Sequence, residues 1–201
     1  MTAQSLQSPA SPDLESRAKG LRAATHDKHE ILDKRIMQAD PFGTRERYAK
    51  FLKVQFDFHT CIEIFYRDKE IEALIPDLRS RTRLDLIRQD LIDIGANPPF
   101  PQMDRDYLVD VPNALGWLYV AEGSNLGAAF LLKEAGKLGL SESFGARHLA
   151  GHIDGRGLHW RRFTEALDAA ELSHDEDARM VEGARQAFDR VLALVEQAFY
   201  R

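Results

Sequence analysis

Apolar residues recur at helical spacings along most of the chain, and this pattern predicts an all-α protein. Helices are expected at residues 13–37, 45–69, 71–74, 81–94, 114–138 and 158–170, and a last one starts beside residue 173. No segment has the alternation of a β-strand, and no internal repeat is found. The pattern therefore predicts a single all-α domain of roughly seven or eight helices.

Capping residues set the limits of some of these helices. Thr44 is placed to cap the second helix, and Ser-His-Asp-Glu at residues 173–176 fits a capping box for the last one. Residues 1–12 are rich in Ser, Gln and Pro and are expected to form a disordered tail. This leaves residues 13–201 as the folded domain.

The helix expected at residues 114–138 contains three interior glycines, Gly116, Gly123 and Gly127. Each costs a helix about 1 kcal/mol relative to alanine, so the backbone itself is expected to approach something closely. Gly123 and Gly127 are four residues apart and share a face, with Ser124 beside them. That face suits either a flat ligand or a closely packed helix, and close packing is the commoner case.

The first two helices place polar residues beside or within their apolar faces. Arg22, His26 and His29 lie next to the apolar stripe of the first helix, and Gln55 and His59 interrupt that of the second. The spacing of the two histidines permits metal chelation, but no third ligand follows from the sequence. Arg22 precedes His29 by two turns, about 10 Å along the axis. This distance fits an iron porphyrin that is bound by His29 and whose carboxylates reach Arg22. Histidines that only form hydrogen bonds within the fold are, however, more common.

Composition excludes several classes of protein. The chain has 201 residues, 44% hydrophobic and 29% charged, which suits one globular domain with its own core. A net charge of −5 gives no reason to expect nucleic acid as a partner. No stretch reaches the roughly 20 apolar residues of a membrane span, and the polar N-terminal segment indicates a cytoplasmic protein. The single cysteine, Cys61, excludes a disulfide framework.

Four segments together resemble the haem oxygenases, specifically the small bacterial haem-degrading enzymes. They are LRAATHDKHEILDKRI for the proximal helix, PFGTRERYAKF with QFDFH, GWLYVAEGSNLGAAFLLK for the distal helix, and FGARHLAGHIDGRGLHWRRF. The segments follow the family's order and span most of residues 21–163. The resemblance implies the family's helical fold, with haem between a proximal and a distal helix.

The resemblance also implies roles for residues on the proximal side. His29 matches the axial ligand of the haem iron, whereas His26 matches a position that is not a ligand. Arg22 falls where many members place a lysine near a haem propionate. Tyr119 is expected to hydrogen-bond a propionate.

On the distal side, Gly123 and Gly127 match the glycines that lie against the haem. Animal-type enzymes carry an aspartate directly after the first of these glycines to order the catalytic water, and here that residue is Ser124. The water is therefore expected to be held through Gln55 and His59, which match a polar pair in similar bacterial enzymes. Three histidines of the last matched segment are interpreted as structural: His148, His152 and His159.

The resemblance implies an enzyme that opens haem oxidatively to biliverdin, ferrous iron and carbon monoxide. Haem b would be both cofactor and substrate, with O2 consumed and electrons supplied by an external reductase, a ferredoxin or ascorbate. A bacterial phytochrome is a candidate acceptor of the biliverdin. The alternative is a non-catalytic haem-binding or haem-transfer protein of the same fold. Arg22 favours cleavage at the α-meso carbon, and the choice between iron acquisition and chromophore synthesis stays open.

Overall fold

The computed structural model describes residues 16–99 and 110–201, and these residues form helices and loops, with no strand among them. The described α-helices are α1 (Arg17–Gln38), α2 (Arg45–Ile62), α3 (Lys69–Leu74), α4 (Leu84–Asp93), α5 (Val111–Gly136), α6 (Arg156–Ala169) and α7 (His174–Phe199). Short 3-10 helices lie between some of them: η1 (Phe65–Arg67), η2 (Leu78–Arg81) and η3 (Arg147–Leu149). The all-α prediction is confirmed. The predicted tail at 1–12 and the predicted helix start at residue 13 lie outside the described residues.

Several helix boundaries differ from the sequence prediction; α5, for example, begins at Val111 instead of residue 114. The second helix, expected to continue to about residue 69, ends at Ile62 and is followed by η1. Asp68 then begins α3, because its side chain accepts two backbone N–H groups in the first turn of that helix. The helix expected from residue 81 begins at Leu84, since η2 occupies the chain just before it.

The predicted caps are present. The hydroxyl of Thr44 accepts the backbone N–H of Arg47 at 3.2 Å, which starts α2. Ser173 and Glu176 form the capping box of α7, in which each side chain accepts the backbone N–H of the other residue. Asp110 caps α5 in the same way as Thr44 caps α2.

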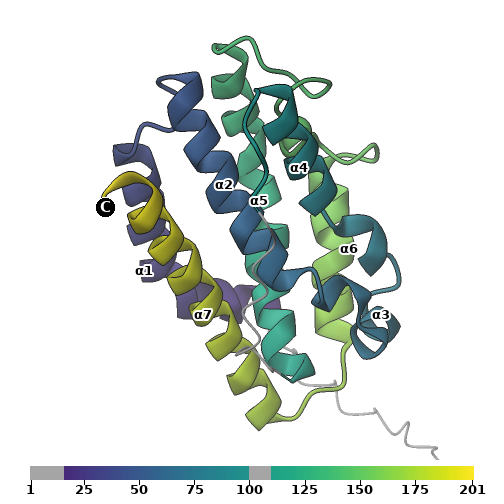
Figure 1. Ribbon diagram of the computed structural model, residues 1–201. Helices are drawn as coiled ribbons and strands as arrows, with labels where there is room; N and C mark the ends of the chain where they lie inside the picture. The colour runs from purple at the N-terminus through teal and green to yellow at the C-terminus, as the bar shows by residue number, and fades with distance from the viewer. Residues whose placement is uncertain (1–15, 100–109) are drawn as a thin grey trace, which may run out of the picture.

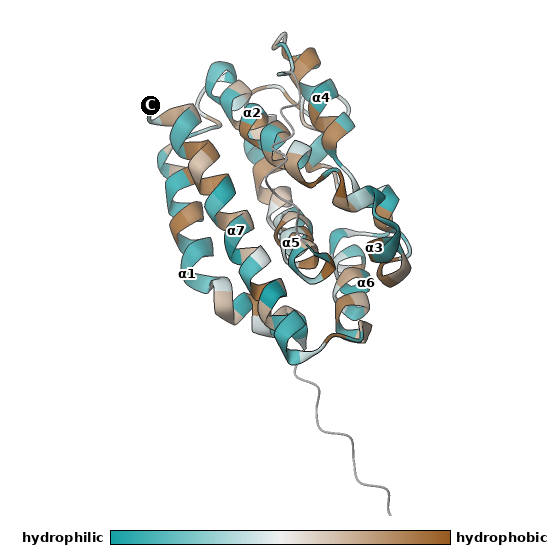
Figure 2. Cartoon of the chain, turned by 60° about the horizontal axis from the view of Figure 1, so that its bottom comes forward, coloured by the Kyte–Doolittle hydropathy of each residue, from teal (hydrophilic) through white to brown (hydrophobic). Residues whose placement is uncertain are grey.

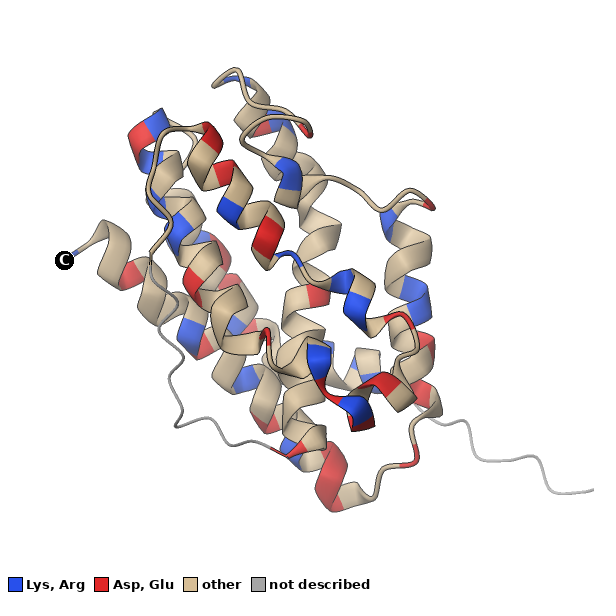
Figure 3. Cartoon of the chain, turned by 45° about the vertical axis from the view of Figure 1, so that its right-hand side comes forward, with Lys and Arg blue, Asp and Glu red and all other residues tan. Residues whose placement is uncertain are grey.

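Helix α5 runs through the middle of the molecule, between α2 and α7 on one side and α6 on the other (Figure 1). Helices α1 and α7 lie side by side, and hydrophilic and hydrophobic positions alternate along both (Figure 2). Positively and negatively charged residues are interspersed along the helices (Figure 3). No helix of the described residues is long and apolar enough to span a membrane.

Close packing between α5 and α7 explains one of the interior glycines. A Cβ built on Gly116 would lie 2.0 Å from the carbonyl oxygen of Met180 on α7. Conversely, a Cβ on Gly183 would lie 2.0 Å from the carbonyl oxygen of Asn113 on α5. Neither contact leaves room for a methyl group, so the two backbones touch directly here.

The core of the described residues forms two clusters around α5. The larger includes Trp117 and Tyr66 and packs against the first half of α5. The smaller includes Tyr48 and Phe51 and packs against the second half. The segment of α5 between the two clusters, residues 123–127, faces a cavity instead.

Candidate functional site

A cavity of about 1040 Å³ lies between α1 and α5 and is also lined by α2, η3 and α7. The side chains on its walls are largely apolar or aromatic, with a few polar groups among them, as expected of a small-molecule site. The structure brings all eight predicted site residues to this one cavity: Arg22, His29, Gln55, His59, Tyr119, Gly123, Ser124 and Gly127.

His29 is positioned by contacts on two sides. Its Nδ1 lies 3.1 Å from Oδ2 of Asp33, one turn further along α1. Phe188 of α7 meets the ring edge-on, with ring centroids 5.7 Å apart. These contacts orient the imidazole and leave Nε2 available to a ligand, in the way that a carboxylate commonly orients a metal-ligating histidine.

His26 also lines the cavity, but its contacts differ from those of His29. Its Nε2 lies 3.3 Å from Oε1 of Glu30, so in His26 the nitrogen near a carboxylate is the one at the outer end of the ring. The geometry therefore favours His29 over His26 as a ligand. Asp33 was not identified from the sequence, although a carboxylate four residues after a candidate ligand is the signal that could have found it.

Tyr119 lies on the cavity wall near Arg22. Its hydroxyl donates a weak hydrogen bond to the carbonyl oxygen of Ala18, at 3.4 Å, and its ring packs against Trp160 with centroids 5.5 Å apart. Burial raises the pKa of the Tyr119 phenol, while the nearby guanidinium of Arg22 acts in the opposite direction. Tyr119 is thus a neutral donor beside an exposed cation, a pair that suits a carboxylate group of a ligand.

The glycine face of α5 opens onto the cavity and carries no packed helix. A Cβ on Gly127 would meet nothing within 4 Å, and one on Gly123 would make only an ordinary contact, 3.6 Å from the ring of Trp160. Close helix packing therefore explains Gly116 but does not explain Gly123 or Gly127. The hydroxyl of Ser124 donates to the carbonyl oxygen of Ala121 at 2.7 Å and is engaged within its own helix.

Gln55 and His59 reach the cavity from α2. His59 is buried, and its Nδ1 has no hydrogen-bond partner in the protein. Burial lowers the pKa of His59 to about 3, with further contributions from Arg83 and His148. The imidazole is therefore neutral near pH 7 and can exchange hydrogen bonds with a molecule in the cavity.

Sequence reasoning missed two polar groups at the inner end of the cavity. Arg83 lies between η2 and α4, and its guanidinium donates to the carbonyl oxygens of His148 and Ala150. Its Nε is buried without a partner, and burial lowers its pKa. His148 bonds to Asp90, which pins the loop as expected, but it also lines the cavity. An isolated arginine before a helix gives no sequence signal for such a position.

A buried polar cluster lies behind the glycine face. Glu122, next to Gly123, accepts hydrogen bonds from Tyr66 and from Arg81, both at 2.9 Å. Nε2 of His159 accepts from the same guanidinium at 3.0 Å, and the ring stacks on His152. These contacts support the structural interpretation of His159 and His152.

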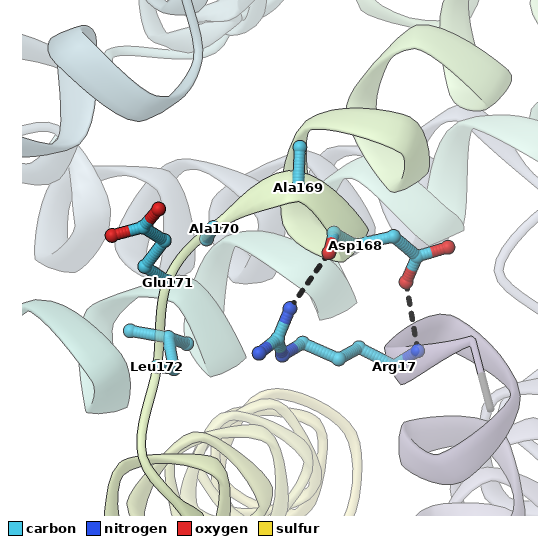
Figure 4. A pocket seen from close by; sticks show the side chains of 6 residues that line it. All are labelled: Arg17, Asp168, Ala169, Ala170, Glu171 and Leu172. Atoms are coloured by element: carbon cyan, nitrogen blue, oxygen red, sulfur yellow. Dashed lines mark hydrogen bonds between the residues drawn. The ribbon is translucent and has the colours of Figure 1, made fainter. Parts of the chain in front are cut away.

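A second, shallower hollow lies between the start of α1 and the end of α6 (Figure 4). Arg17 donates from its guanidinium to the carbonyl oxygen of Asp168 at 2.9 Å and from its backbone N–H to the carboxylate at 2.7 Å. Its Nε donates to Asp177 of α7 at 2.7 Å. The polar groups of this hollow satisfy one another and hold helices together.

The donor set of the cavity suits haem better than a bare metal ion. No group of three or more His, Cys, Asp or Glu residues in the described part of the chain is arranged to hold a metal. A porphyrin supplies four nitrogens itself and needs one axial imidazole, an apolar slot and partners for its carboxylates. The cavity offers all three: His29, the glycine face, and Arg22 with Tyr119.

Comparison with known proteins agrees with this interpretation. The profile of the heme oxygenase family matches residues 15–197. The chain is 40% identical to heme oxygenase PigA of Pseudomonas aeruginosa over 194 residues, which cover 95% of this chain and 97% of that protein. The structure is similar to that of the NO- and CO-bound heme oxygenase from Neisseria meningitidis, with a TM-score of 0.87, 43% identity and 92% of each chain covered. Heme oxygenase from Leptospira interrogans has the same fold, with a TM-score of 0.72 at 17% identity.

Proposed function

The chain belongs to the haem oxygenase family and acts as a haem oxygenase, and on that premise we propose how its cavity binds haem and directs its oxidation. The observation that carries the proposal is the pairing, in one cavity, of an oriented histidine with a helix face bare of side chains. A haem carrier needs the oriented histidine but has no use for the bare helix face. Family membership likewise favours turnover over the non-catalytic alternative.

On the proximal side, Nε2 of His29 would hold the iron of bound haem. Oδ2 of Asp33 lies 3.1 Å from Nδ1, close enough to favour a hydrogen on that nitrogen and to make the imidazole a better donor to a metal. Phe188 limits rotation of the ring. Bound haem supplies the redox chemistry with O2 that ends in biliverdin, ferrous iron and carbon monoxide.

On the distal side, Gly123 and Gly127 let the porphyrin approach the backbone of α5. The hydroxyl of Ser124 is directed to its own helix, so it does not replace the water-ordering aspartate of animal-type enzymes. Gln55 and neutral His59 instead hold the water that delivers protons, because both reach the cavity and Nδ1 of His59 is unpartnered.

Arg22 and Tyr119 would hold the haem propionates. An exposed guanidinium and a phenol hydroxyl with only a long hydrogen bond of its own are well suited to carboxylates. Such anchors would favour cleavage at the α-meso carbon.

Electrons come from outside the chain, from a reductase or a ferredoxin in the cell or from ascorbate in the test tube. The reaction takes place in the cytoplasm, where such donors are available, and a biliverdin acceptor such as a bacterial phytochrome takes up the product. The interspersed positive and negative residues (Figure 3) and the net charge of −5 offer no support for nucleic acid as a partner.

Mixing the purified protein with haemin and then adding ascorbate tests the proposal. We expect the Soret band to disappear while a broad red biliverdin band grows. A Soret band that persists under competent reductants would support a haem carrier instead. The same experiment with His29→Ala should give neither normal turnover nor a normal haem spectrum.

A further inference from the structure

A buried histidine outside the predicted site presents an unused ring nitrogen to the cavity. His148 of η3 has 4% of its surface exposed and lines the cavity with His59 and Arg83. Its Nε2 has no hydrogen-bond partner in the protein. Buried polar atoms without a partner are uncommon in native proteins, and a polar cavity supplies a partner in the form of a bound molecule.

Asp90 determines which ring nitrogen of His148 carries the hydrogen. Nδ1 of His148 lies 2.8 Å from Oδ2 of Asp90 on α4. The same carboxylate accepts the backbone N–H groups of His148, at 2.9 Å, and of Arg147, at 2.8 Å. Because Asp90 acts as acceptor throughout, Nδ1 is the donor and Nε2 is left as a bare acceptor.

The groups around Nε2 suit water. Arg83 lines the same cavity and has an Nε–H without a partner, and His59 on α2 adds an unpartnered ring nitrogen. A water molecule can accept from Arg83 and donate to His148, whereas an anion cannot donate to Nε2. The other charged groups near His148 are engaged with one another, since Arg147 pairs with Asp90 and Asp93.

We propose that His148 is a positioning residue for the distal water of this haem oxygenase. Its Nε2 accepts one hydrogen of the water and Arg83 donates to the oxygen, which leaves the second hydrogen free for another acceptor. His148 itself neither gains nor loses a proton. The proposal rests on the placement of haem between α1 and α5 given above, and it extends the water site beyond Gln55 and His59.

The tautomer can be tested in the haem-free protein, independently of turnover. Two-bond nitrogen–proton NMR correlations at pH 7 should show a protonated Nδ1 and a bare Nε2 for His148, assigned by their loss in His148→Phe. Asp90→Asn should abolish this preference, because an amide can also donate to the ring. A wild-type His148 protonated at Nε2 would overturn the proposal whatever the haem-bound enzyme does.

The water-positioning role is tested by His148→Phe, which keeps an aromatic side chain but removes the Nε2 acceptor together with the Nδ1 donor. We expect turnover to fall about tenfold, with haem affinity changed by less than about twofold. The acid–alkaline transition of the ferric complex should shift by about one pH unit, because its distal hydrogen bonding changes. His148→Gln, which restores an acceptor oxygen, should recover part of both effects.

His152→Phe is the matched control, because His152 lies on the same loop but does not line the cavity. His152→Phe should leave turnover and the acid–alkaline transition of the ferric complex unchanged. The proposal fails if His148→Phe has no effect, if the control has an equal effect, or if His148→Gln rescues nothing. His29→Ala tests the haem placement separately, so the failure of one idea is distinguishable from that of the other.

Discussion

The two histidines of α1 differ in which ring nitrogen lies near a carboxylate. Nδ1 of His29 is near Asp33, whereas Nε2 of His26 is near Glu30. We therefore expect His29→Ala to lose normal turnover and the normal haem spectrum, because the proposed iron ligand is removed. His26→Ala should bind and degrade haem nearly normally. Absorption spectra and biliverdin yield check both, and the reverse behaviour of the two variants would reject the ligand assignment.

Arg22 provides a test of the propionate anchor at the level of one side chain. Arg22→Ala should weaken haem binding severalfold or give a mixture of biliverdin isomers, because the haem is freer to rotate in its plane. Haem titration and chromatography of the product measure the two effects. An unchanged dissociation constant together with one unchanged isomer would remove Arg22 from the site.

The buried His59 makes stability depend on pH. Its pKa is about 3 in the folded protein against 6.5 for an exposed histidine, so the unfolded chain binds a proton more readily. Stability should therefore fall as pH decreases below about 6.5, by up to about 1.4 kcal/mol per unit from this group. The dependence of stability on pH should be weaker in His59→Gln. Urea unfolding of the haem-free protein at pH 7, 6 and 5 checks this, and parallel curves for both proteins would contradict it.

At the scale of helices, α5 uses glycine for two different purposes. Gly127 faces open space, so Gly127→Ala should keep or raise the stability of the haem-free protein. The free energy of unfolding should rise by up to about 1 kcal/mol, and the melting temperature should stay the same or rise with it. The added methyl would nevertheless enter the cavity, so biliverdin yield should fall sharply. Gly116→Ala is the matched control, because its methyl would collide with the backbone of α7.

Thermal melts and biliverdin yield on the same preparation separate the two roles. Gly116→Ala should lose stability by about 1–3 kcal/mol or more while each folded molecule keeps its activity. If Gly127→Ala behaves like Gly116→Ala, destabilised but fully active, the distal-face interpretation is wrong.

Helix periodicity and caps were readable from the sequence because they depend on residues close together in the chain. Thr44 and the Ser173–Glu176 box are local in this sense, and both were confirmed. The end of α2 at Ile62 was missed because Asp68 starts a new helix within a continuous apolar pattern. The gathering of His29, Gln55 and Gly127 on one cavity followed only from resemblance, since the three come from different helices.

Groups whose role depends on distant partners could not be predicted at all. Arg83 reaches the cavity because its guanidinium is held by carbonyl oxygens of η3 and the loop after it, more than sixty residues away. Likewise, Asp90 and His148 are 58 residues apart, and neither spacing nor composition indicates that they meet. Such long-range hydrogen bonds are visible only in the folded chain.

At the scale of the molecule, α1 forms one wall of the cavity and is attached mainly to α7. Few of its residues are buried: Leu21, Thr25 and Leu32. Charged pairs join the two helices along their length: Arg17 with Asp177, Lys28 with Asp189 and Arg35 with Glu196. Since these pairs are partly exposed, salt screens them. This wall of the cavity is therefore held in part by electrostatic attraction.

This attachment predicts that product release depends on ionic strength. Biliverdin or haem should dissociate faster as salt is raised, because screening weakens the attraction between α1 and α7. Lys28→Ala should show severalfold faster release at low salt and a weaker salt dependence than the wild type. Lys34→Ala is the matched control, because Lys34 pairs only with Glu30 of its own helix. Stopped-flow transfer of haem to an acceptor protein measures the rates. Release that is independent of salt, or equal in the two variants, would mean that apolar contacts alone hold α1 in place.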